Sequence, residues 1–173
     1  RNDPDDLILF AAPNAQFSVP GSLPRFGTAG DPFWILPQNN VSGTLFLGQR
    51  TVADQGLFQS SINGAFRPSA LGNIILEMTQ VTGSGPADGG LFAVWESRQL
   101  GSLEFHFDSS DGIDGGDYLE PVQIGGHTHY NWGMTQPGIY EVTFKASGKL
   151  NPQHGNHDTS AEQTYTYTVP YSN

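Results

Sequence analysis

The chain has 173 residues, enough for one domain with a sizeable core, and it combines 22 glycines and 12 prolines with only 14% charged residues. This composition is typical of an all-β protein with many turns. The net charge of −10 argues against nucleic acid and anionic membranes as partners, and the lack of cysteine in the sequence excludes disulfides and thiolate metal sites.

Short strands separated by Gly- and Pro-rich loops are predicted for the first third of the chain. The apolar residues 7–10 predict a buried strand, and residues 16–19 predict a second short one. Prolines on both sides limit residues 31–38 to an edge strand or extended segment, which Trp34 anchors. Residues 44–47 predict a further strand.

The second half of the chain carries stronger strand signals. Strands are predicted at residues 74–81, 91–96, 102–107, 127–132, 139–146 and 163–169. In residues 139–146 the side chains of Tyr140, Val142 and Phe144 share one face, so this strand is half-buried. Roughly ten strands with this spacing predict an antiparallel, immunoglobulin-like β-sandwich with long Gly/Pro-rich loops, formed by residues 1–173 as a single domain. No apolar run is long enough to span a membrane, so membrane insertion of this segment is not expected.

Two histidines stand two residues apart in the stretch GGHTHYNWGMTQPG, residues 125–138. On a strand, His127 and His129 would point to the same face, with Cα atoms roughly 6.5 Å apart. Two neutral imidazoles at this spacing form half of a Zn²⁺ or Cu²⁺ site, which normally needs three or four protein ligands. The alternative is a polar edge-strand face on which both histidines bond to their neighbours.

His106 is the candidate for a third ligand. It lies in the sequence FHF, where strand alternation puts it on the face of Glu104 and Asp108, opposite Phe105 and Phe107. If this strand neighbours residues 127–132, His106 would complete the metal site. Otherwise it is an exposed histidine on a solvated face.

Other candidate ligands have simpler alternatives. Met134 offers a soft ligand for copper, but it equally suits packing at a turn. His154 and His157 lie in a polar loop and are expected to be solvated. An acidic, glycine-rich loop suits Ca²⁺, although aspartate and glycine also build ordinary turns and the spacing is not that of an EF-hand. Its aspartates are Asp108, Asp111, Asp114 and Asp117.

Catalytic motifs are lacking: the sequence has no Gly-x-Ser-x-Gly, no phosphate-binding loop and no defined carboxylate pair. The protein is therefore predicted not to be an enzyme. Trp34, Trp95, Tyr140 and Phe144 are predicted core residues, and Tyr140, directly after a Pro-Gly turn, is interpreted as a tyrosine corner.

Three segments resemble the choice-of-anchor M domain, also described as the actinobacterial surface-anchored protein domain. They are residues 27–38 (GTAGDPFWILPQ), 91–95 and 126–148 (GHTHYNWGMTQPGIYEVTFKASG). The family pattern has a GDP-x-W-x-LPQ segment followed by H-x-H-x-NW and PG-x-Y-x-VTF. The resemblance implies an exported, extracellular, surface-associated protein with a tie to metal handling. Family members usually begin with a further segment of histidines and acidic residues, which this chain is expected to lack.

Two functional hypotheses follow from these observations. The first is a non-enzymatic, exported domain that binds Zn²⁺ or Cu²⁺ through His127 and His129, with His106 as the candidate third ligand and Ca²⁺ a candidate for the Asp108 to Asp117 loop. The second is a structural or adhesive surface domain that forms homo-oligomers or binds a cell-surface partner. Carbohydrate binding is a third reading that rests only on the abundant aromatic residues and the candidate calcium loop.

Overall fold

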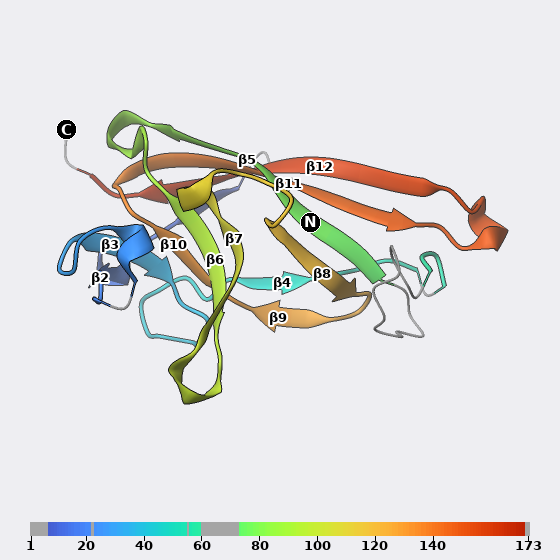
Figure 1. The fold of residues 1–173 in the computed structure, drawn as a ribbon, viewed down its shortest axis with the longest axis horizontal. Helices are drawn as coiled ribbons and strands as arrows, with labels where there is room; N and C mark the ends of the chain where they lie inside the picture. The colour runs from blue at the N-terminus through green and yellow to red at the C-terminus, as the bar shows by residue number, and fades with distance from the viewer. Residues whose placement is uncertain (1–6, 22, 55, 60–72, 172–173) are drawn as a thin grey trace.

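Two five-stranded β-sheets and a two-stranded ribbon form the fold (Figure 1). The computed structural model describes residues 7–21, 23–54, 56–59 and 73–171. The strand order is β1-β12-β11-β5-β8 in the first sheet and β2-β3-β10-β6-β7 in the second, and β4 pairs with β9 in the ribbon. The prediction of an all-β sandwich is confirmed. Within the described residues no helix is long and apolar enough to cross a membrane.

The strands differ widely in length. The first sheet contains β1 (Ile8–Phe10), β5 (Asn73–Ser84), β8 (Tyr118–Gln123), β11 (Gly138–Lys149) and β12 (Asp158–Val169). The second contains β2 (Gln16–Ser18), β3 (Pro32–Leu36), β6 (Phe92–Ser97), β7 (Leu103–Asp108) and β10 (Asn131–Met134), and the ribbon consists of β4 (Gly48–Arg50) and β9 (His127–His129). Short 3₁₀ turns connect strands at η2 (Pro13–Ala15), η3 (Pro24–Phe26), η4 (Gly85–Ala87), η5 (Gln99–Gly101), η6 (Ser109–Asp111) and η7 (Pro152–His154).

Several strand predictions differ from the structure. The predicted edge strand in residues 31–38 is β3, which pairs with β2 on one side and β10 on the other. Of the strand predicted to be buried at residues 7–10, Leu9 is buried but Ile8 and Phe10 are exposed. Residues 44–47 are not a strand, and β4 begins only at Gly48. The predicted strand 127–132 is divided into β9 and β10. Strand β8 was not predicted; it contains Pro121, and it lies at a sheet edge, where the missing N–H of proline is tolerated.

The long hairpin of β11 and β12 extends beyond the rest of the sandwich (Figure 1). Every residue of β11 is paired with β12, and β11 also pairs with β5. Side chains alternate as the sequence predicts, so Tyr140, Val142 and Phe144 are buried while Glu141 is exposed. Among the described residues, the strand on the other side of β12 is the short β1, which runs parallel to β12, an exception to the antiparallel prediction.

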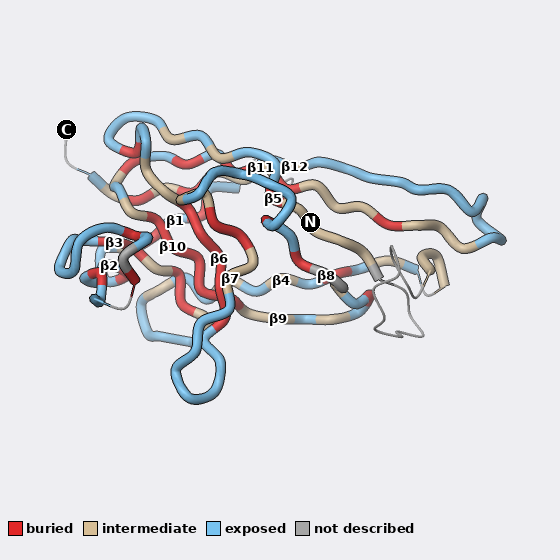
Figure 2. The backbone as a smooth tube through the Cα atoms, viewed as in Figure 1, coloured by how far each residue is buried: buried red, intermediate tan, exposed pale blue. Residues whose placement is uncertain are grey.

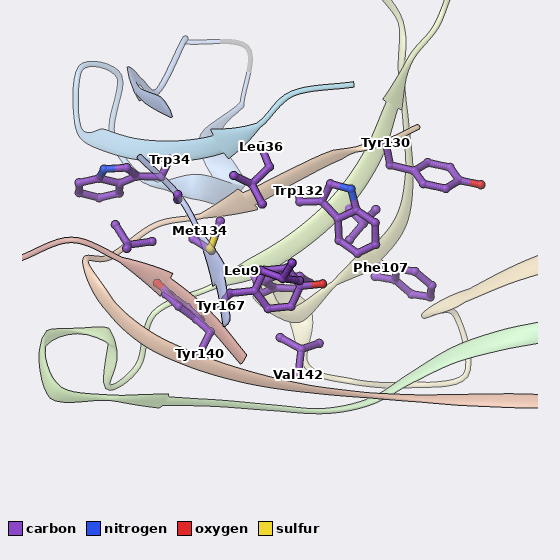
Figure 3. Packing of buried hydrophobic residues seen from close by; sticks show 14 of the residues in the cluster. Leu9, Trp34, Leu36, Phe107, Tyr130, Trp132, Met134, Tyr140, Val142 and Tyr167 are labelled. Carbon is purple, nitrogen blue, oxygen red and sulfur yellow. The ribbon is translucent and has the colours of Figure 1, made fainter. Parts of the chain in front are cut away.

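Trp132 of β10 lies at the centre of the core between the two sheets (Figure 3). Its ring stacks on Tyr167 of β12 with a centroid distance of 6.1 Å and an interplanar angle of 25°. It also meets the rings of Phe144, Tyr130 and Phe92 at centroid distances of 6.3, 6.3 and 6.4 Å. Aromatic pairs at these distances add stability beyond the burial of their area, and these contacts join both sheets.

A second apolar cluster covers the outer face of the second sheet. Phe26, in the loop before β3, stacks on Phe33 at 5.8 Å and contacts Trp95 at 5.3 Å. Strand β6, which lies between β10 and β7, is therefore buried on both faces over residues 92–96 (Figure 2). Gly133 permits this packing, because a Cβ there would lie only 2.6 Å from the Trp95 ring. Trp34, Trp95, Tyr140 and Phe144 are all buried, as predicted.

The Tyr140 hydroxyl fixes the turn that precedes its strand. It donates to Gln136 O and accepts from Gln136 N, both at 2.9 Å. This confirms that Tyr140 is a structural residue of the tyrosine-corner kind. Burial raises the pKa of Tyr140 to about 12, although the hydrogen bonds with Gln136 act to lower it. Burial raises the pKa of Tyr167 as well.

Replacing Phe144 by alanine should lower the free energy of unfolding by about 3–5 kcal/mol, because it removes a buried ring from the centre of the core. Denaturant unfolding would measure the change. Glu141→Ala, on the exposed face of the same strand, should cost less than about 0.5 kcal/mol. Equal effects of the two substitutions would contradict the assignment of the faces of β11.

The free energy of unfolding should decrease as the pH rises above about 10. In the unfolded chain Tyr140 ionises near pH 10, whereas in the folded protein it keeps its proton to about pH 12. Over this interval the folded state binds more protons, so rising pH favours unfolding. Tyr140→Phe should reduce the loss of unfolding free energy between pH 10 and 12 by about 2–3 kcal/mol. A variant whose pH dependence matches the parent would show that Tyr140 ionises normally when folded.

Candidate metal site

The chain changes sheets at Tyr130, and this change positions the histidine pair. Before it, β9 pairs with β4, and after it, β10 pairs with β3 and β6. Asn131 holds the point of change: its Nδ2 donates to Gln38 Oε1 at 3.2 Å and to Ser97 Oγ at 3.1 Å, and its Oδ1 accepts from Gln38 N at 3.0 Å. The histidines thus project from a short ribbon that is joined directly to the rigid core.

His127 and His129 lie on the same face, as the sequence predicts. Their ring centroids are 4.6 Å apart, and in β4 they stand opposite Arg50 and Gly48 respectively. Both rings lean over Gly48. A Cβ at Gly48 would lie 2.5 Å from His127 Nε2 and 2.7 Å from His129 Cε1. Glycine at this position therefore makes room for the two imidazoles to converge.

His129 is held in a defined orientation. Its ring stacks on Phe46 at 3.7 Å with an interplanar angle of 3°. Its Nδ1 lies 3.2 Å from Leu47 O, where it can only donate, because a carbonyl oxygen only accepts. With the proton on Nδ1, the lone pair is on Nε2. This is the arrangement found around metal-ligating histidines, whose second nitrogen donates to a carbonyl or carboxylate.

These surrounding residues could not be found from the sequence. Phe46, Leu47, Gly48 and Arg50 lie about eighty positions before the histidines in the chain. Residues 44–47 were expected to be a strand, but they form the extended segment that provides the Leu47 carbonyl and the Phe46 ring. A glycine beside two apolar residues carries no signal of its own.

His106 does not join the pair. Strand β7 pairs with β6, and β6 lies between β7 and β10. Strand β7 therefore does not neighbour β9, which pairs with β4. The His106 Nε2 lies 3.4 Å from Glu96 Oε2, and its ring meets Tyr130 edge-on at 5.3 Å. In the described part of the chain, no three His, Cys, Asp or Glu side chains are grouped closely enough to hold a metal ion.

A β-bulge at His106 explains why simple alternation fails in β7. Val94 pairs with Phe107 and the next residue, Trp95, pairs with Phe105, so His106 is the extra residue. Phe107 therefore packs between the sheets, whereas Phe105 packs in the cluster on the outer face. The expectation that these two phenylalanines share a face is wrong, because the bulge shifts the alternation by one residue.

Charged groups surround His106 at this end of the second sheet. Arg98 bonds to Glu96 at 2.5 Å and to Glu104 at 2.7 Å, and Glu96 is almost fully buried. Burial and the charge of Glu96 raise the pKa of Tyr130, whose ring covers His106. The cluster satisfies a buried carboxylate, which needs a cationic partner in a protein interior. Its role here is structural.

The remaining candidate ligands have structural roles or are exposed. Met134 is fully buried in β10 and packs in the core between the sheets. His154 and His157 are exposed, as predicted, at the turn between β11 and β12.

The aspartates of the predicted calcium loop bond mostly to their own backbone. Asp117 Oδ1 accepts from Asp108 N at 2.6 Å, and its Oδ2 accepts from Asp114 N at 2.9 Å. Asp114 Oδ1 accepts from Gly116 N at 2.6 Å. Asp108 forms an ion pair with Arg25. Burial raises the pKa of Asp117. The carboxylates thus close the loop, as aspartates commonly do in turns.

Comparison with protein-family models, characterised proteins and solved structures found no match to this chain. The resemblance of residues 126–148 to the choice-of-anchor M domain therefore stays a prediction.

Proposed function

We propose that this protein is a non-enzymatic β-sandwich domain that binds Zn²⁺ or Cu²⁺ through Nε2 of His127 and Nε2 of His129. The observation that carries the proposal is the contact of His129 Nδ1 with Leu47 O, 3.2 Å long, which assigns the free lone pair to Nε2. Convergence of both rings over Gly48 supports it. A carbonyl that orients the ring through its second nitrogen is a feature of metal-ligating histidines that an ordinary pair of surface histidines lacks.

Two protein ligands leave the coordination of Zn²⁺ or Cu²⁺ incomplete, so water or groups from a partner fill the other positions. Arg50 stands opposite His127 in the ribbon, and its positive charge opposes the binding of a cation. The isolated domain is consequently expected to bind the metal ion weakly. A partner that supplies another ligand would strengthen it.

The proposal also includes export of the protein to the cell surface. It is supported by the resemblance of residues 27–38 and 126–148 to a surface-anchored family. The non-enzymatic role is supported by the lack of catalytic motifs in the sequence.

A structural domain that assembles with copies of itself is a second candidate. Apolar residues on the outer face of the first sheet favour it, because Ile8, Phe10 and Ile139 are 65%, 48% and 37% exposed. Phe10 and Ile139 both flank Thr168 on neighbouring strands, so they form part of one surface. Exposed apolar patches mark interaction surfaces in soluble proteins.

Zinc binding should depend on both histidines. Calorimetry near pH 7.5 should detect one Zn²⁺ per chain, and the ion should raise the melting temperature. The double variant His127→Ala/His129→Ala should lose most of this binding, while His154→Ala should keep it. Affinity should fall on acidification, because protons compete with the metal ion for imidazole lone pairs. Arg50→Gln should bind Zn²⁺ more tightly than the parent. A double variant that binds as well as the parent would overturn the proposal.

The assembly candidate makes a separate prediction. Light scattering at high protein concentration should detect a defined oligomer, and Phe10→Lys should dissociate it, because a charge on the apolar surface opposes its burial. Glu141→Ala, on the same outer face, serves as the matched control. A parent that stays monomeric at all concentrations, with and without divalent cations, would rule out this candidate.

A further inference from the structure

The histidine pair of β9 supplies half of a tetrahedral zinc site and is accessible at the surface. His127 is exposed and His129 is half-buried (Figure 2). Their ring centroids are 4.6 Å apart, so both rings can reach one ion at the Zn–N distance of about 2.0–2.1 Å. A closed zinc site takes four ligands in a tetrahedron. Two more ligands would have to reach the ion from the exposed side of the pair.

The chain has no second pair of imidazoles to offer this ion. Its three other histidines lie elsewhere: His106 stands beside a buried glutamate in β7, and His154 and His157 lie at the turn between β11 and β12. Across the ranges that the structure describes, no group of three His, Cys, Asp or Glu side chains could hold a metal ion. Four carboxylates lie outside the described side chains, namely those of Asp3, Asp5, Asp6 and Glu120.

A second copy of the chain carries the two ligands that are missing. Two-fold symmetry brings the same surface patch of two copies together, so an ion on the symmetry axis meets both histidine pairs. Four neutral imidazoles then complete the tetrahedron that Zn²⁺ prefers. The bond between His129 Nδ1 and Leu47 O already orients one ring of each pair for this role.

Exposed apolar side chains precede β4 and favour a protein as the partner. Phe46, whose ring stacks on His129, is 38% exposed, and Val41 and Leu45 of the same segment are exposed as well. Exposed apolar surface of this kind marks interaction sites in soluble proteins. A second copy bound at the histidine pair would cover the Phe46 ring, which water ligands would leave exposed.

We propose that one Zn²⁺ joins two copies of this chain, with His127 and His129 of each copy as its four ligands. This inference rests on the metal site of the proposed function and names the partner that completes it. The site is closed in the dimer and half-open in the single chain, so the ion binds more tightly when it is shared.

Electrostatics makes the association depend on the ion. Each copy has a net charge of −10, so two copies repel one another without zinc. Arg50, opposite His127 in the ribbon, places a positive charge from each copy near the shared ion. Arg50→Gln should therefore strengthen the zinc-dependent dimer, because it removes repulsion between the guanidinium groups and Zn²⁺.

The test titrates Zn²⁺ into the metal-free protein and follows the molecular mass by sedimentation velocity. The protein should be monomeric without zinc, and the dimer should be most abundant at one ion per two chains. Beyond one ion per chain the dimer should dissociate, because each histidine pair then holds an ion of its own and water completes its coordination. This rise and fall is expected of a shared ion, and it ends at one Zn²⁺ per chain.

Co²⁺ in place of Zn²⁺ reports the geometry of the site. Tetrahedral Co²⁺ absorbs visible light far more strongly than octahedral Co²⁺, and geometry of this kind is diagnostic of the ligand set. The absorption per ion should be greatest at one Co²⁺ per two chains and should fall as more ion is added.

Matched variants locate the contact between the copies. His127→Ala/His129→Ala should stay monomeric at every zinc concentration. His154→Ala/His157→Ala, which removes the two exposed histidines of the hairpin turn, should dimerise as the parent does. Phe10→Lys should also dimerise, because the outer face of the first sheet takes no part in this contact.

A fourth variant tests for ligands within the same chain. It combines Asp3→Asn, Asp5→Asn, Asp6→Asn and Glu120→Gln, which neutralises the carboxylates outside the described side chains. It should form the zinc-dependent dimer as the parent does.

The outcomes separate this inference from the proposed function. Zinc binding that depends on His127 and His129 but leaves the protein monomeric at every ratio would overturn the dimer and leave the metal site standing. A parent that binds no zinc would overturn both. A zinc-dependent dimer that persists in His127→Ala/His129→Ala, or that is lost when the four carboxylates are neutralised, would show that other ligands hold the ion and would overturn the inference.

Discussion

The burial of Trp132 between the two sheets is the interaction on which the rest of the structure depends. The indole stacks on Tyr167 of the first sheet, and it belongs to β10, a central strand of the second. Phe144 and Phe92 enclose it from the two sheets. Because cores are close-packed, the position of one large ring fixes the spacing of both layers. Removing the indole would open a cavity between the two sheets.

The histidine ribbon depends on this anchor through the chain itself. Asn131 and Trp132 stand directly after Tyr130, so the polar network of Asn131 and the burial of Trp132 hold the start of β10. The preceding residues are then free to pair with β4 outside the two main sheets. A candidate metal pair is thus supported by a rigid element although it lies on a three-residue strand, which is what a preorganised binding site requires.

Strand β4 lies between the histidine pair and an apolar cavity of the sandwich. Gly48 and Arg50 share the face of the histidine pair, whereas Gln49 points inward and lines this cavity, with its Oε1 buried. Strand alternation places these residues on opposite faces. One short segment thereby faces the exposed histidine pair on one side and lines an apolar cavity on the other.

The sequence by itself determined the fold class, the main core residues and the common face of His127 and His129, because strand alternation is a local property. The alternation in residues 139–146 and the Pro-Gly turn before Tyr140, for example, were sufficient to predict which face of this strand is buried. Only the tertiary structure decided that the predicted strand 127–132 divides at Tyr130, since the division depends on partners in β3, β4 and β6. The bulge at His106, which shifts the faces of β7, also depends on pairing with β6. The Leu47 carbonyl and the placement of Gly48 beneath the two imidazole rings come from a segment distant in the chain, and local sequence patterns carry no information about such contacts.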